Sequence, residues 1–379
     1  MQFRLRKQYL LVFLMAVCAS AFGAATNSAS GLTEQQRLSI ALEALSRLKD
    51  VDISANPEFK KAADKLLKKT RGTPTFVEVV KQLQLKDQNE GLLQVAINNP
   101  AQESGVEAVR LILANDGSAL LKSSLQGSNA VKTVEALGNS GKKEIVPLLV
   151  PIVTDKERDL VLRKQAVRSL AQIQEGASRL LKLAKEEKLS QDLKLTASTE
   201  LNNVRWEKVK ADAAKVLPLP QSHDAKPLPS VAEMLKMKGD AANGEKVFFR
   251  PETSCGACHQ VKGRGTEIGP ALSEIGTKLG KEAIYESILE PSAGISLGYE
   301  ASQVELKSGD EAYGLVISET DDEIALKDLK GIVAHYKRSD IAKREQLKTS
   351  IMPTGLQQTM SAQEFVDLVE FLAMLRTGK

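Results

Sequence analysis

Three residues in the second half of the chain have the types and spacing needed to hold an iron cofactor. Cys255 and Cys258 are separated by two residues, and His259 follows directly. This spacing places both thiols on one local turn, where each can add across a vinyl group of haem to form a thioether. The adjacent imidazole can then serve as the proximal ligand of the iron. The motif therefore predicts one covalently attached haem c.

The same motif is also compatible with two other kinds of site. A zinc site would need a fourth ligand, and the remaining histidines are His223 in a proline-rich segment and His335 on an expected strand. A redox dithiol would open a helix within a βαβ unit, a pattern that the surrounding sequence lacks. Both alternatives stay open, and the sequence favours haem attachment over them.

Two further residues are candidates to complete the site. Pro270 follows the motif after a short loop, and its carbonyl oxygen is a candidate acceptor for the second ring nitrogen of His259. Met352 lies in a loop held by proline, and its thioether is a candidate for the sixth iron position. His/Met ligation would raise the reduction potential. Packing roles are expected for the other methionines of the mature chain, Met234, Met237, Met360 and Met374.

The composition excludes several classes of protein. Among 379 residues there are three cysteines and three histidines, too few for a disulfide-rich scaffold or a multi-histidine metal centre. Aromatic residues make up 4% of the chain, which argues against a large β-sandwich or propeller. The formal net charge is +4, and no nucleic-acid partner is expected.

The first 25 residues have the pattern of a secretory signal peptide. Three basic residues precede an apolar run over residues 9–19, which small residues follow through Ala25. The run is shorter than the roughly 20 residues that a membrane-spanning helix needs. We therefore expect cleavage near Ala25 and a location in the periplasm or otherwise outside the cytoplasm. Two alternatives stay open: an uncleaved amphipathic anchor, and lipidation at Cys18.

Residues 26–217 are expected to form paired helices. Similar short helical units recur around Val109, Val134, Val167 and Ser198, which are 25, 33 and 31 residues apart. Second helices are expected between them. Helix pairs at this interval predict an N-terminal α-solenoid and resemble degenerate HEAT-type repeats. An ordinary helical bundle is the alternative.

The region that carries the motif is set apart by composition. Residues 218–230 contain four prolines and are expected to form a linker. Residues 231–379 begin with helical patterns and continue with a β-meander of four short strands, inserted at about residues 299–337. A capping box at Ser361 and Glu364 then starts a closing helix. The fold class is thus mainly α, with a small inserted sheet.

The charges divide at the linker. Residues 26–230 hold 31 basic and 25 acidic residues, a net charge of +6, whereas residues 231–379 hold 18 and 23, a net charge of −5. Opposite signs on two tethered domains favour docking of the domains on each other, or of each on a differently charged partner. It is equally consistent with this charge division that the charged surfaces are only solvated and bind no specific partner.

From about residue 239 to 375 the sequence resembles a class I cytochrome c with an insertion. More closely, it is similar to the haem-binding domain family described from planctomycetes and verrucomicrobia. The stretches that carry the resemblance, besides the motif itself, are residues 269–272, 290–292, 298–299 and 350–356. The resemblance implies a helical cytochrome c-like domain with covalent haem c, attached at Cys255 and Cys258. It also implies that His259 and Met352 are the axial ligands.

These features predict an electron carrier rather than an enzyme. A monohaem c-type cytochrome would take electrons from a dehydrogenase and pass them to a downstream cytochrome or oxidase. In proteins of the family that this chain resembles, the haem domain often follows a dehydrogenase-like propeller or a HEAT-like region in the same chain. Because this chain has no propeller, the dehydrogenase would be a separate protein. The alternatives are a haem-based redox or gas sensor that binds a partner, and a peroxidase-like enzyme. Met352 discriminates between them, since a peroxidase-like enzyme or a gas sensor needs an open sixth position on the iron.

Overall fold

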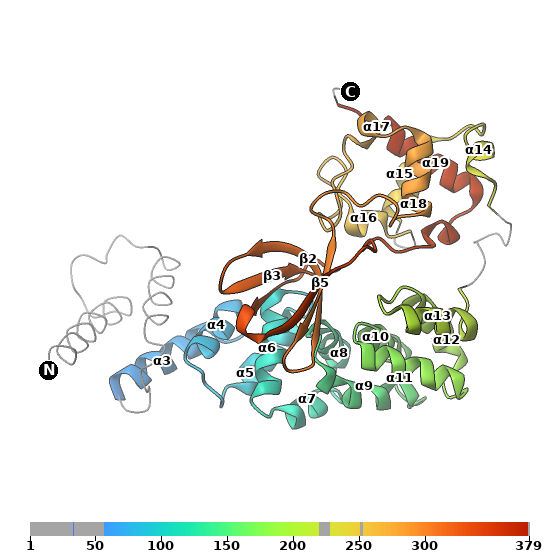
Figure 1. Ribbon diagram of the computed structural model, residues 1–379. Helices are drawn as coiled ribbons and strands as arrows, with labels where there is room; N and C mark the ends of the chain where they lie inside the picture. The colour runs from blue at the N-terminus through green and yellow to red at the C-terminus, as the bar shows by residue number, and fades with distance from the viewer. Residues whose placement is uncertain (1–32, 34–56, 220–227, 251–252, 378–379) are drawn as a thin grey trace. The chain divides into compact units, whose positions relative to one another are not determined.

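The computed structural model describes residue 33 and residues 57–219, 228–250 and 253–377. The described chain is mainly helical and contains a small antiparallel sheet (Figure 1). It divides into two compact units, which are taken separately below: one holds the described residues up to Pro100 and Ser104–Ala136, and the other holds Ala101–Glu103 and the residues from Leu137 onward.

Several predictions fall on residues that the structure does not describe. The signal peptide at residues 1–25 and most of the linker at 218–230, including His223, lie outside the described ranges. The lipidation site at Cys18 lies outside them as well. Among the helices that the structure describes, none has the length and apolar character needed to cross a membrane.

The first unit is built from short helices around an aliphatic core. Its helices are α3 (Pro57–Thr70), α4 (Pro74–Gln82), α5 (Asn89–Asn98), most of α6 (Glu103–Ala114), α7 (Ser118–Ser124) and most of α8 (Ala130–Asn139). Proline occupies the first position of α4, where its missing N–H has no intrahelical acceptor to lose. Phe76 of α4 is 1% exposed and lies against Gly91 of α5, where a β-carbon would meet the phenyl ring.

The second unit begins with consecutive packed helices. After the end of α8 come η2 (Lys143–Ile145), α9 (Val146–Thr154), α10 (Leu160–Ala171), α11 (Gln174–Lys185), α12 (Gln191–Asn202) and α13 (Glu207–Val216). Helix α10 packs against α9, α11 and α12. The four recurring positions of the sequence, in α6, α8, α10 and α12, are all buried. Helix pairing of this kind is compatible with the predicted α-solenoid, which stays a prediction.

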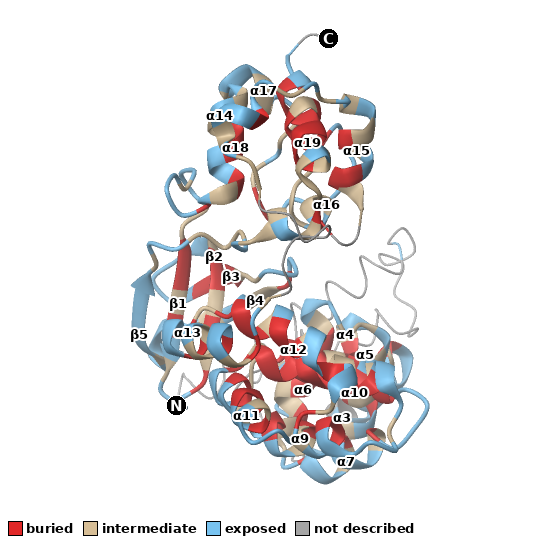
Figure 2. Ribbon diagram, turned by 90° about the vertical axis from the view of Figure 1, so that its right-hand side faces the viewer, coloured by how far each residue is buried: buried red, intermediate tan, exposed pale blue. Residues whose placement is uncertain are grey.

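The cysteine motif belongs to a small helical domain in the same unit. Its elements are α14 (Val231–Met234), α15 (Ala241–Phe249), α16 (Cys255–Cys258), α17 (Ile275–Lys278), α18 (Lys281–Leu289), η4 (Leu356–Thr359) and α19 (Ala362–Met374). Helix α19 packs against α15, α17 and α18, and Figure 2 shows its buried face in red. The predicted capping box is confirmed: Glu364 N donates to Ser361 Oγ at 3.2 Å, and Ser361 N donates to Glu364 Oε2 at 2.8 Å.

The inserted sheet has five antiparallel strands rather than four. They are β1 (Ala301–Leu306), β2 (Glu311–Glu319), β3 (Glu323–Lys327), β4 (Val333–Lys337) and β5 (Ile341–Gln346), in the order β4-β3-β2-β1-β5. The four predicted strands are present, but the predicted end of the insertion at residue 337 is corrected by β5, which pairs with β1. This edge strand is almost wholly exposed and reads Ile-Ala-Lys-Arg-Glu-Gln, so it lacks the apolar alternation that marks a half-buried strand.

The crossing of α15 and α19 depends on a glycine. A β-carbon at Gly244 would lie 2.0 Å from the carbonyl oxygen of Asp367 and 2.8 Å from Phe371 Cβ. We expect Gly244→Val to lower the stability of this domain by roughly 2–3 kcal/mol, because the backbone of α19 must move to admit the side chain. For a domain of this size the midpoint of thermal unfolding should fall by roughly 5–10 °C, measured by circular dichroism.

Gly294→Ala is the matched control for this prediction, because a β-carbon there meets no atom within 4 Å. A Gly244→Val protein that unfolds at the same temperature as the control would contradict the close crossing.

Candidate functional site

The cysteine motif forms a single helical turn. Ser254 precedes it with a left-handed backbone (φ 58°), the turn α16 spans the two cysteines, and His259 leaves it in an extended conformation. The backbone N–H of His259 donates to Cys255 O at 2.9 Å. Both cysteines are free and partly buried. The structure therefore brings both thiols and the imidazole onto one short turn, as the spacing predicted.

A loop after the motif holds this turn from one side. The amides of Ile268 and Gly269 both donate to Cys258 O, at 3.1 and 2.7 Å, and Thr266 N donates to Gly256 O at 3.2 Å. These bonds give the carbonyl groups at the end of α16 partners that the one-turn helix cannot supply. The loop, residues 261–272, is called the proximal loop below.

The imidazole of His259 has a defined tautomer. Its Nδ1 lies 2.7 Å from the carbonyl oxygen of Pro270, which was the predicted acceptor. A carbonyl oxygen only accepts hydrogen bonds, so Nδ1 carries the proton and Nε2 carries the lone pair. Within the described part of the chain, Nε2 has no hydrogen-bond partner. A hydrogen bond of this kind to a backbone carbonyl orients the ring of a metal-bound histidine.

Two glycines allow the proximal loop to approach the ring. A β-carbon at Gly269 would lie 2.6 Å from His259 Cε1, and one at Gly265, where φ is +95°, would lie 2.3 Å from His259 O. Gly269 was noted in the sequence within residues 269–272, without a role at the ring, and Gly265 was missed. The signal was present: two glycines in Lys-Gly-Arg-Gly directly after the motif indicate a close backbone approach.

Phe249 and Arg264 were also missed as neighbours of the motif. Phe249 packs against Gly256, where a β-carbon would lie 2.8 Å from the ring. The guanidinium of Arg264 lies 4.0 Å from the centroid of the Phe249 ring, and its NH1 group donates to Glu245 Oε1 at 2.6 Å. No local pattern pairs these residues, because they come from α15 and the proximal loop.

Burial disfavours the charged form of all three side chains of the motif. It raises the pKa of the Cys255 thiol to about 11 and raises the pKa of Cys258 as well. It lowers the pKa of His259, although the hydrogen bond to Pro270 acts in the opposite direction. Neutral thiols suit thioether formation, which leaves no charge on sulfur, whereas a reactive dithiol uses a thiolate. Among the described residues, no group of three His, Cys, Asp or Glu side chains is arranged to hold a metal ion.

Met352 lies against the same core as the motif. Its side chain is partly buried and packs on the cluster of buried residues that Cys255 also contacts. Its backbone N–H donates to Ser350 Oγ at 3.1 Å, and Ser350 N donates to Ser292 Oγ at 3.0 Å. The loop that carries Met352 is therefore tied to the chain after α18. Of the rival methionines, Met234 and Met360 are buried in the core, and Met374 is 60% exposed.

These residues fit covalent haem c. The motif supplies two protonated thiols, and the imidazole keeps a lone pair on Nε2 while its other nitrogen is held by Pro270. Gly269 lies against the His259 ring so closely that a side chain at this position would displace the ring. A thioether from the other end of the domain packs on the same core. The donor set is that of a His/Met-ligated haem.

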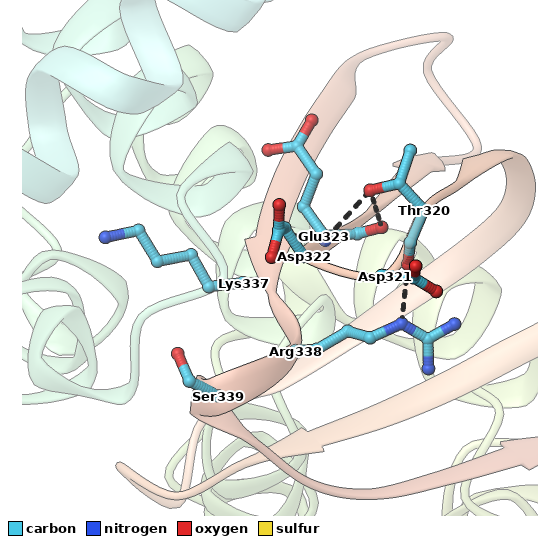
Figure 3. Close-up of a pocket in the computed structure, with 7 residues that line it drawn as sticks. All are labelled: Thr320, Asp321, Asp322, Glu323, Lys337, Arg338 and Ser339. Atoms are coloured by element: carbon cyan, nitrogen blue, oxygen red, sulfur yellow. Dashed lines mark hydrogen bonds between the residues drawn. The ribbon is translucent and has the colours of Figure 1, made fainter.

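The remaining candidates lie elsewhere. His335 is a side chain of β4, as predicted, with Nδ1 3.0 Å from Glu323 Oε1. An open surface pocket of about 720 Å³ lies where the β2–β3 turn meets the end of β4, and Arg338 Nε donates to Thr320 O across it at 2.7 Å (Figure 3). None of the predicted haem residues lines this pocket, whose walls are Thr320, Asp321, Asp322, Glu323, Lys337, Arg338 and Ser339.

Comparison with known proteins agrees with the chemistry of the motif. Residues 241–326 match the family model of cytochrome c. The match covers α15, the cysteine turn, His259 and Pro270, and it ends before the loop of Met352. A comparison with curated proteins finds no similar sequence. The match of residues 241–326 supports a c-type cytochrome and suggests haem-based electron transfer.

Proposed function

We propose that this chain is an exported monohaem c-type cytochrome that carries electrons from a separate dehydrogenase to a downstream cytochrome or oxidase. One observation carries the proposal: His259, with Nδ1 bonded to Pro270 O and Nε2 without a partner among the described residues, stands beside two free thiols in a segment that matches cytochrome c. Haem c bound there would supply one-electron transfer by cycling of its iron between the ferric and ferrous states.

Each residue of the site has a distinct part in this function. Cys255 and Cys258 would hold the cofactor through thioethers, so that it cannot dissociate. His259 would bind the iron through Nε2, and Pro270 O fixes the direction of its ring and increases its basicity. Met352 would hold the iron through its thioether, which would leave no position for substrate and would raise the potential. The protein thus sets potential and access and performs no bond chemistry.

The finer parts of the proposal rest on sequence patterns. The signal-like first 25 residues support a periplasmic or otherwise exported protein. The recurring buried positions of α6, α8, α10 and α12 support a HEAT-like arm for a protein partner. The ordered matches between residues 239 and 375 support membership of the planctomycete and verrucomicrobial haem-binding domain family.

Replacement of Met352 tests the axial ligand. We expect the wild-type protein to show low-spin haem with a thioether-to-ferric-iron absorption band, and Met352→Ala to lose that band because the only proposed sulfur ligand is gone. Met374→Leu is the matched control, since its side chain is 60% exposed on α19, and it should keep the band. A high-spin ferric wild type would favour the sensor or peroxidase function instead.

Replacement of the cysteines tests covalent attachment. Acid–acetone extraction should leave haem on the wild-type chain and remove all of it from the Cys255→Ala/Cys258→Ala double variant. Each single variant should keep haem through the one remaining thioether, with a shifted pyridine haemochrome band. The chain mass of each variant, measured by mass spectrometry, reports the attachment directly; wild-type chain without added mass after maturation would refute it.

Replacement of Gly269 tests the support of the proximal ligand. A valine would push the imidazole away from Pro270 O, because even its β-carbon would lie 2.6 Å from His259 Cε1. Loss of the hydrogen bond that orients a metal-bound histidine typically lowers metal affinity or activity about 10–100-fold. We therefore expect Gly269→Val to contain five-coordinate haem at neutral pH, measured by electron paramagnetic resonance, while Gly294→Ala remains low-spin. An unchanged spectrum would show that the glycine does not support the ring.

A further inference from the structure

Two turns of the inserted sheet contact helices from the other side of the proline-rich segment. The helices belong to residues 137–217, called the arm segment below. The first of the two turns joins β1 to β2 and makes its contact together with the start of β2. The second turn joins β3 to β4. All of these residues belong to the second compact unit. Neither contact is used by the proposed electron transfer, and both are polar.

The β1–β2 turn presents a buried carboxylate to the arm segment. The Asp310 side chain is 3% exposed and lies 2.6 Å from Lys142 Nζ. It also accepts hydrogen bonds from Ser308 Oγ at 2.7 Å and from Lys143 N at 3.4 Å. Burial alone would raise the pKa of Asp310, but the hydrogen bonds from Lys142 and Ser308 outweigh it and lower the pKa. The carboxylate is thus ionised and fully partnered within the contact.

The first residue of β2 extends this contact. Glu311 Oε2 accepts from Arg205 NH2 at 2.9 Å and from Trp206 Nε1 at 3.0 Å. The guanidinium of Arg205 lies 4.1 Å from the Trp206 ring centroid and 5.1 Å from that of Tyr313 on β2. Charged and aromatic groups from both sides therefore interlock, in the manner of anchor residues at protein interfaces.

The β3–β4 turn contacts the ends of successive arm helices. Lys330 Nζ donates to Asn139 Oδ1, at the end of α8, at 2.7 Å. With the amide of Gln172, just after α10, turned so that its nitrogen faces Gly138 O at 3.1 Å, its oxygen accepts from Lys330 Nζ at 2.7 Å. A lysine at helix C-termini is favoured by the negative end of the helix dipole. The C-terminal ends of α8 and α10 thus lie near the same lysine of the β3–β4 turn.

The same turn also contacts the proximal loop. Lys327 Nζ donates to Glu267 O at 3.2 Å, and a β-carbon at Gly331 would lie 3.6 Å from Ile268 Cγ1. Ile268 N in turn donates to Cys258 O. The sheet therefore contacts the arm segment on one side and the loop beside the cysteine motif on the other.

We propose that the inserted sheet is a docking element that binds the arm segment of its own chain and fixes the cytochrome domain on it. The net charges, +6 before residue 230 and −5 after it, have the signs that this contact requires. A linker of 13 residues spans at most about 45 Å, so the two surfaces stay at high effective concentration. The haem group would then be presented at a set position relative to the arm instead of swinging on a flexible tether.

Charge reversal with rescue tests this proposal in the full mature chain. Size-exclusion chromatography with small-angle X-ray scattering gives the radius of gyration and the mass together. We expect Asp310→Lys and Lys142→Asp each to increase the radius of gyration and the maximum dimension, and the double variant to return to wild-type values. Lys330→Met, which acts on the other turn, should also expand the protein.

Asp212→Lys is the matched control, because it breaks an ion pair of similar length, 2.7 Å to Lys185, that lies wholly within the arm segment. It should remain compact, and circular dichroism should show native helix content in every variant. An expanded wild type, single variants that stay compact, or a double variant that stays expanded would each overturn the proposal. A dimeric mass for the compact form would overturn docking within one chain in favour of exchange between two copies. The measurement does not require haem, so its failure is distinguishable from failure of the proposed electron transfer.

Discussion

The close crossing of α15 and α19 is the constraint on which the cytochrome domain depends. These are nearly the first and last helices of the domain, and Gly244 lets their backbones approach to a distance that no side chain would permit. The cysteine turn follows α15 by a few residues, and the loop of Met352 precedes α19. Packing the two helices together therefore brings both loops onto one core, although about 90 residues separate them. Without this crossing the two predicted axial ligands, His259 and Met352, would have no fixed position relative to each other.

The two sides of the candidate site are built by different means. On the side of His259 the contacts are local, since the proximal loop folds back within about ten residues and caps the turn with backbone hydrogen bonds. Its glycines remove the atoms that would otherwise separate loop from ring. On the side of Met352 the contacts are distant, through Ser350 to Ser292 and through the shared core. The insertion of the sheet lies between these two sides in sequence, so the domain must close around it.

The sheet shows how a polar insertion can be accommodated without a large core of its own. Its buried cluster is small, with Val304, Ala312, Ile324 and Leu326 as the fully buried members. Charged side chains at two of its turns contact the arm segment, and groups of the arm segment pair with them. Buried ion pairs contribute to stability only when their geometry is good and their other lone pairs are satisfied, and Asp310 meets both conditions. Such contacts favour one arrangement over others more than they add affinity.

The sequence alone was sufficient to predict the class of chemistry and much of the local structure. Two cysteines, one histidine and their spacing indicated the cofactor, the prolines and charges indicated where the chain changes character, and alternating residues located four strands. These features are short-range, so a single sequence displays them. Tertiary structure decided what depends on distant residues: the edge strand β5, which is held by β1 and has no apolar pattern of its own, the contact of Gly265 with the motif, and the pairing of Lys142 with Asp310 across 168 positions. Only packing brings such residues together, because the chain carries no local signal for a partner that lies far away in sequence.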